Sequence, residues 1–243
     1  MGKRYKGKLC VYCSRKVSES DDHIFAREFF LVEDRHNLPK APACRQCNKD
    51  KSVLEHYLIS ALSFGGQHSQ AIENLKANAT RRLSKNRKLH ERLLRGSQAV
   101  WVKDGGGVYQ RMMAAPFEGE KLDALLKYIA RGLVWHHFQK YVGLDWSIRV
   151  IFAPNTLSTY YATQFSTLPS EMIKKADLGR GTVKYEVAQI GPPELFICKV
   201  FLYGGVMLAH AQSVHAGIEG EPSRLWWVIV GEPELADQVM GRV

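Results

Sequence analysis

Polar and apolar residues follow no regular period in the first 44 residues of the chain. A helical spacing of apolar residues begins near Arg45, and it predicts a helix over residues 44–64 that Gly65 and Gly66 end. Residues 69–95 carry leucines at helical spacing among many cations, which predicts one or two helices with a strongly basic face.

From residue 98 onward the pattern changes to that of a sheet. Residues 99–103 and 108–113 flank the sequence DGGG, which predicts a β-hairpin. A helix is predicted over residues 120–141, because its apolar side chains recur every three or four positions and form a stripe typical of a core. Strand-like runs follow at residues 147–153, 182–190, 195–201, 206–211 and 225–230.

These patterns predict an α+β protein in three parts. Residues 1–64 form a small N-terminal module, residues 65–97 a basic helical segment, and residues 98–243 a domain with an antiparallel sheet and one long helix. No run approaches eighteen consecutive apolar residues, and the first residues lack the apolar stretch of a secretory signal. We therefore expect a soluble protein of the cytoplasm with no membrane partner.

Positive charge is concentrated in the first two-fifths of the chain. Residues 1–95 hold 20 Lys and Arg against 10 Asp and Glu, whereas residues 96–243 hold 14 of each. Neutralising phosphates with such a surface releases counterions and contributes affinity for nucleic acid. The alternative is a basic surface that is merely solvated.

Four of the five cysteines form two C-x2-C pairs separated by thirty residues. In a reducing compartment this spacing favours one tetrahedral zinc ion over disulfides, and the zinc would stabilise a module with little core of its own. The ligands would be Cys10, Cys13, Cys44 and Cys47. Cys198 lies in an apolar run, where we expect a buried thiol without a chemical role.

The residues between and after these pairs resemble the HNH nuclease family, whose ββα-metal fold carries an Asp-His pair, a central Asn and C-x2-C-Asn-x2-Lys. The matching stretches lie within residues 8–55: Cys10-Val-Tyr-Cys13, Asp22-His23-Ile24, Asn37-Leu38 and Cys44-Arg-Gln-Cys47-Asn48-Lys-Asp-Lys51. In place of the Pro and Gly pair of many members, this chain has three phenylalanines at positions 25, 29 and 30. That departure leaves Asp21 as an alternative to Asp22.

The resemblance implies metal-dependent hydrolysis or nicking of DNA, which is favoured over RNA. His23 would be the general base, and either the side chain of Asn37 or the backbone beside it would hold His23 in orientation. Asp22 and Asn48 would bind the catalytic Mg²⁺ or Mn²⁺, with Glu55 as a further candidate for the metal shell. The residues expected to contact the nucleic-acid backbone are Arg45, Lys51, Arg81, Arg82, Lys85 and Lys88. The biological setting that the resemblance favours is defence against phage.

Two other classes of function fit the same residues. A zinc ribbon that binds DNA or RNA without cutting it would share the cysteines and the basic helix, but it would not need Asp22, His23 and Asn48. In an interaction protein, the zinc would only stabilise the fold while the C-terminal domain bound a partner. Taken singly, a His beside an acid is often a turn residue, and an Asn after C-x2-C is often a helix cap.

Overall fold

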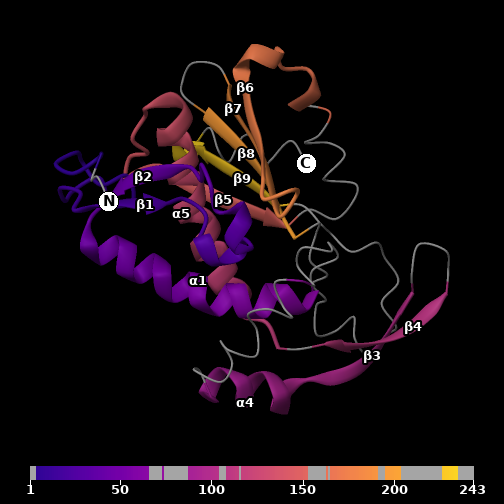
Figure 1. Ribbon diagram of the computed structural model, residues 1–243. Coiled ribbons are helices and arrows are strands. Elements are labelled where there is room, and N and C mark those ends of the chain that lie inside the picture. Colours follow the sequence, from indigo (N-terminus) through magenta and orange to yellow (C-terminus); the bar gives the residue numbers. More distant parts are fainter. Residues whose placement is uncertain are drawn as a thin grey trace.

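The computed structural model describes residues 4–65, 73, 87–103, 108–114, 116–152, 163, 165–190, 195–203 and 226–234 of the 243-residue chain. Its N-terminal part is an antiparallel hairpin followed by a helix (Figure 1). Strand β1 (Ser20–His23) pairs with β2 (Lys40–Ala43), with Ser20 opposite Ala43 and His23 opposite Lys40. Two short 3-10 turns, Arg27–Phe29 and Val32–Asp34, lie between the strands. Helix α1 (Arg45–Gly65) begins at the residue after Cys44, so Cys47 lies in its first turn.

The C-terminal part is built on a five-stranded sheet of order β5-β9-β8-β7-β6, in which every neighbouring pair is antiparallel. Its strands are β5 (Ser147–Phe152), β6 (Ile173–Leu178), β7 (Val183–Ile190), β8 (Leu195–Leu202) and β9 (Trp226–Gly231). A 3-10 turn, Ser170–Met172, precedes β6. In β8 and β9, apolar residues point to both sides of the sheet. One side packs against α5, and the other holds a smaller buried cluster that includes Ile197, Trp227 and Ile229.

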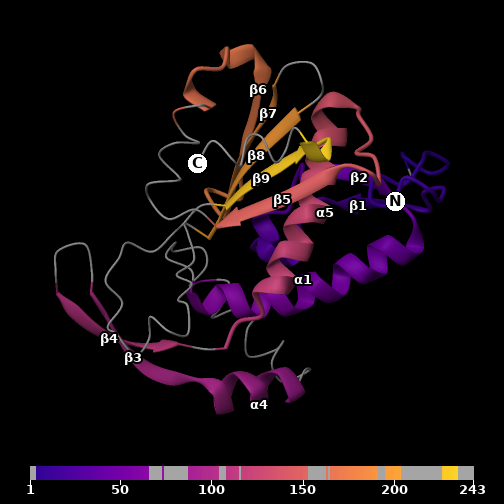
Figure 2. The same cartoon turned by 180° about the vertical axis from the view of Figure 1, so that it is seen from behind.

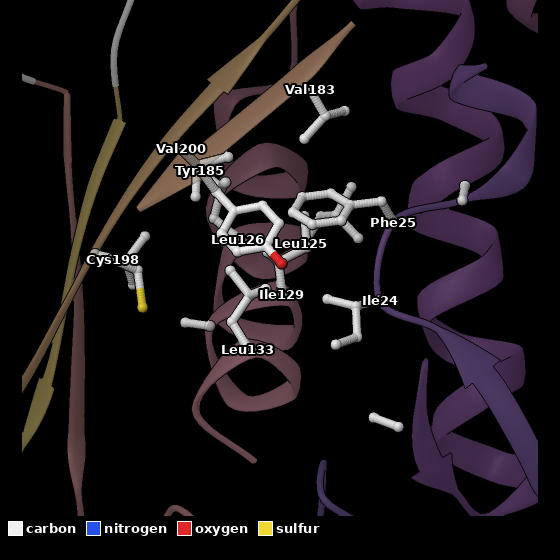
Figure 3. Close-up of a cluster of buried hydrophobic side chains, with 14 of the residues drawn as sticks. Ile24, Phe25, Leu125, Leu126, Ile129, Leu133, Val183, Tyr185, Cys198 and Val200 are labelled. Carbon is white, nitrogen blue, oxygen red and sulfur yellow. The ribbon is translucent and has the colours of Figure 1, made fainter. Parts of the chain in front are cut away.

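Helix α5 (Gly119–Phe138) lies between the N-terminal hairpin with α1 on one side and the sheet on the other (Figures 1 and 2). It ends at Gln139, which adopts a left-handed backbone conformation. Figure 3 shows the two contacts of this helix: Ile24 and Phe25 pack from the hairpin, and Val183, Tyr185 and Val200 pack from the sheet. A helix covered on two sides must be apolar over most of its circumference. The buried residues of α5 are Leu122, Leu125, Leu126, Ile129, Ala130, Gly132, Leu133, Val134 and Trp135.

One hydrophobic core therefore joins the N-terminal and C-terminal parts of the molecule. It runs from the first cysteine through the phenylalanines after β1, along α5, and into β7, β8 and β9. Gly132 marks the closest approach, because a Cβ at this position would lie 3.0 Å from Ile24 Cγ1. The phenylalanine-rich segment that replaces the glycine pair expected after Asp-His supplies apolar side chains to this core: Phe25, Phe29 and Phe30 are at most 1% exposed.

A third part projects from this body. Helix α4 (Arg87–Gly96) leads into a two-stranded antiparallel ribbon of β3 (Gln98–Lys103) and β4 (Tyr109–Ala114). In Figures 1 and 2 the ribbon extends beyond the C-terminal end of α1 and away from the five-stranded sheet.

The α+β class, the antiparallel sheet, the 98–113 hairpin and the long helix are confirmed. Strand β6 was not predicted, and the predicted strand at residues 206–211 lies outside the described residues. The prediction that Cys198 is buried is confirmed, since the residue is 0% exposed. Among the described helices, none is long and apolar enough to cross a membrane.

Candidate metal centre and its surroundings

The four paired cysteines lie together at the start of the molecule. The sulfur atoms of Cys10, Cys13, Cys44 and Cys47 all lie within 4.8 Å of one another, and Cys13 and Cys44 are 4.0 Å apart. Four thiolates bound to one zinc at about 2.3 Å are separated by nearly the same distance. All four are free cysteines rather than disulfides. The donor set and its spacing thus fit the predicted structural zinc, and these residues could hold such an ion.

Backbone hydrogen bonds lower the pKa of one of these thiols, that of Cys13. The backbone N–H groups of Arg15 and Lys16 donate to Cys13 and hold its thiol pKa at about 7, despite partial burial. Burial raises the pKa of Cys10 and Cys47, where neighbouring thiolates add repulsion. A divalent cation would relieve that repulsion, because zinc binds cysteine as the thiolate.

Beside the cysteines, Asp22 belongs to a buried polar network between β1 and α1. Its Oδ2 accepts a hydrogen bond from the Tyr12 hydroxyl at 2.6 Å and lies 3.1 Å from Lys51 Nζ. Lys51 Nζ also contacts Glu55 Oε1 and donates to the carbonyl oxygen of His23 at 2.7 Å. Burial and the charge of Asp22 raise the pKa of Tyr12 well above its ordinary value, so its phenol stays protonated and remains a donor.

Lys51 is a buried structural cation, and the prediction that it contacts the nucleic-acid backbone is wrong. The residue is 0% exposed. An ammonium group has three N–H donors, and here all three have oxygen acceptors. The spacing C-x2-C-Asn-x2-Lys includes Lys51, but the inward direction of its side chain depends on the packing of α1 against β1.

Glu55 lies one helical turn after Lys51 and completes this network. Burial raises the pKa of its carboxyl group to about 7, although the nearby ammonium acts in the opposite direction. The sequence suggested Glu55 as a member of a metal shell, whereas the structure gives it Lys51 as its partner. The spacing of four residues between Lys51 and Glu55 is the signal that could have predicted this pair.

Asn48 lies at the start of α1, on the same side of the hairpin as Asp22. Its side-chain amide nitrogen donates to Ser20 Oγ at 3.1 Å, and Ser20 and Asp22 are two residues apart in β1. Such residues share a face of a strand. A shallow, open pocket of about 400 Å³ lies beside Asn48. It is lined by Glu19, Ser20, Arg45, Asn48, Lys49 and Ser52.

His23 ends β1 and is half-buried. Because successive residues of a strand point to opposite faces, its imidazole belongs to the face opposite Asp22 and shares that face with Lys40, its cross-strand partner. Burial lowers the pKa of His23, and Lys40 lowers it further. The ring is therefore neutral at pH 7, as a general base must be.

Asn37 lies in the loop that leads into β2. It is exposed and adopts a left-handed backbone conformation with φ of 55°, a conformation that asparagine tolerates in turns. In the described part of the chain, no hydrogen bond joins Asn37 to His23. A backbone contact lies nearby, since the N–H of Ile24, next to His23, donates to the carbonyl oxygen of Pro39, two residues after Asn37, at 2.9 Å.

The remaining predicted contacts to nucleic acid are distributed unevenly. Arg45 is exposed and pairs with Glu19 at 2.9 Å on the rim of the pocket. Lys88 is exposed on α4. Arg81, Arg82 and Lys85 lie outside the described residues. Asp21, the alternative to Asp22, accepts the backbone N–H groups of Arg4 and Tyr5, each at 2.8 Å.

The described residues thus contain one group of three or more His, Cys, Asp or Glu side chains spaced to bind a metal, the four cysteines. Comparison of the chain with models of known protein families, with curated proteins and with solved structures finds no match in any of the three.

Proposed function

We propose that this protein is a zinc-supported HNH-type endonuclease that hydrolyses the phosphodiester backbone of DNA. The observation that carries the proposal is the contact of β1 with the first turns of α1 beside the cysteine cluster. Asn48, in the first turns of α1, donates to Ser20; Asp22 lies two residues after Ser20 in the same strand, and His23 ends that strand. The order hairpin, then helix, is the order that the ββα resemblance implied.

In this proposal each polar residue has one task. Neutral His23 accepts a proton from the attacking water, which its lowered pKa permits at pH 7. The amide oxygen of Asn48 and a carboxylate oxygen of Asp22 are the hard donors that Mg²⁺ or Mn²⁺ prefers. The bound cation would supply charge compensation for the scissile phosphate.

The pocket beside Asn48 supports a phosphate as the bound group. Arg45 and Lys49 contribute cations to its lining, and Ser20 and Ser52 contribute hydroxyl donors. Arg45, Asn48, Lys49 and Ser52 recur at helical spacing, so one face of α1 presents them together. The excess of cations over residues 1–95 supplies the long-range attraction for a polyanion.

A plasmid assay tests the proposal directly. Purified protein with zinc and added Mg²⁺ or Mn²⁺ should convert supercoiled plasmid to nicked or linear product. His23→Ala should reduce the rate by about 100-fold or more, the contribution typical of a general base. His36→Ala is the matched control, because His36 is an exposed histidine of the loop between β1 and β2. Cleavage by His23→Ala at the wild-type rate would refute the assignment.

A second candidate, a zinc module that binds nucleic acid without cutting it, is favoured by the buried network. Lys51 already neutralises Asp22, and His23 belongs to the opposite face of the hairpin. This candidate predicts oligonucleotide binding that is independent of added Mg²⁺, with no cleavage in any divalent ion. Asn48→Ala separates the two candidates, since it should abolish cutting in the first and leave binding nearly unchanged in the second.

A further inference from the structure

Helix α4 and the β3–β4 ribbon form an arm that is fixed to the body at its base. Arg92 on α4 pairs with Glu118 at 2.8 Å, and the N–H of Glu118 donates to the Tyr57 hydroxyl on α1 at 2.8 Å. At the C-terminal end of α4, a Cβ on Gly96 would lie 2.6 Å from Pro116 Cγ, so the helix packs tightly against the segment that follows the ribbon. The arm therefore leaves the body from a defined position.

One face of the ribbon is buried at its base, and the other carries exposed aromatic rings. Val100 is only 6% exposed, whereas Trp101, the next residue, is 59% exposed. Tyr109 is 50% exposed and lies on the same face of the ribbon as Trp101, because Trp101 pairs with Arg111, two residues after Tyr109. Arg111 is also exposed. An exposed tryptophan paired with an arginine across a ribbon has no role in the core described above.

The arm is also strongly basic. Residues 87–114 contain six Lys and Arg but only two Asp and Glu. Arg87, Lys88 and Arg95 are exposed on α4, whose C-terminal end leads into the ribbon. A second copy of this chain would bring the same positive charge to the surface, and like charges would oppose its docking. A polyanion with flat apolar groups matches both the charge and the aromatic rings.

From these observations we infer that the arm is a second binding surface, and that its ligand is a nucleic-acid strand with unpaired bases. Bases stack on Trp101, while Arg111 and the cations of α4 contact the phosphates. Stacking on an aromatic ring combined with cationic contacts to the backbone is the way in which proteins bind single strands without sequence preference. The inference rests on the proposed function, because a nuclease that also binds a strand of its substrate outside the active site has a higher affinity for that substrate.

Binding can be measured separately from cleavage. In the full-length His23→Ala protein, fluorescence anisotropy with a labelled 20-nucleotide oligothymidine gives the dissociation constant. Trp101→Ala should raise this constant by about 5- to 100-fold, the range for loss of one base–aromatic stack. Trp101→Phe keeps a ring and should stay within about threefold of the parent. Arg111→Gln should lower the slope of log K against log salt by about 0.7, the value for one phosphate contact on a single strand.

Controls define what would overturn the inference. Tyr141→Ala removes an aromatic residue that is 37% exposed just after α5, and it should leave binding unchanged. A blunt 20-base-pair duplex should show little dependence on Trp101, because its bases are already stacked. The inference fails if Trp101→Ala binds oligothymidine as the parent does, or if the duplex shows an equal loss. It also fails if Trp101→Ala instead abolishes self-association measured by sedimentation. None of these readouts requires cleavage, so the inference and the nuclease proposal can fail independently.

Discussion

Replacing Lys51 with methionine tests the buried network most directly. Methionine keeps much of the volume of the side chain but removes the ammonium, which leaves Asp22 and Glu55 facing each other with little solvent. Removing one partner of a buried ion pair typically destabilises a protein by about 3–5 kcal/mol. In a chain of this length, that corresponds to a decrease in melting temperature of about 10 °C.

Urea denaturation followed by circular dichroism would measure the effect. Lys49→Met removes an exposed lysine two residues away and should change the free energy of unfolding by no more than about 0.5 kcal/mol. Neutralising both acids in Asp22→Asn/Lys51→Met/Glu55→Gln should recover part of the loss, because no uncompensated charge remains buried. A loss below about 1 kcal/mol for Lys51→Met, or an equal loss for Lys49→Met, would refute our interpretation of Lys51 as a buried structural cation.

Three further predictions concern the metal, pH and packing. Chelation of zinc, or Cys47→Ser, should lower the melting temperature by about 10 °C or more, and added zinc should reverse only the chelation. The raised pKa of Glu55 means that its contribution to stability is complete below pH 4.5 and is lost as pH rises to about 7. This change amounts to about 3 kcal/mol, and Glu55→Gln should remove it from a pH series of urea midpoints. Gly132→Val should destabilise by about 1–3 kcal/mol in thermal unfolding, because it would press on Ile24, whereas Gly119→Ala has open space around it and should be neutral.

Much of the fold could be predicted from the sequence because its elements have strong local patterns. The stripe of α5 and the apolar runs of β7, β8 and β9 are such patterns, and each appears in the structure within a few residues of its predicted bounds. Strand β6 was missed because it is an edge strand with the sequence IKKADL, whose charged residues carry no clear period of two. The sequence also did not indicate that the N-terminal and C-terminal parts share one core. That core depends on contacts between residues far apart in sequence, such as Ile24 and Gly132.

The candidate site was predictable in its residue types but not in its geometry. The C-x2-C spacing was enough to bring four thiols together, because each pair is local and only one closure is needed. The direction of the Lys51 side chain depends instead on how α1 packs on β1, and the partners that hold it, Asp22 and Glu55, come from two elements. The motif specifies the order of these residues along the chain, whereas packing determines which of their side chains are exposed to solvent.

The continuous core has a consequence for how this protein could be dissected. An isolated fragment of residues 1–64 would present Ile24, Phe25, Phe29 and Phe30 to water, and burying each such side chain is worth about 1.5–3 kcal/mol. The cysteine cluster and the five-stranded sheet therefore depend on each other for stability, because both pack against the same layer of apolar side chains. Any truncated protein made to study the N-terminal part should retain α5 and the sheet.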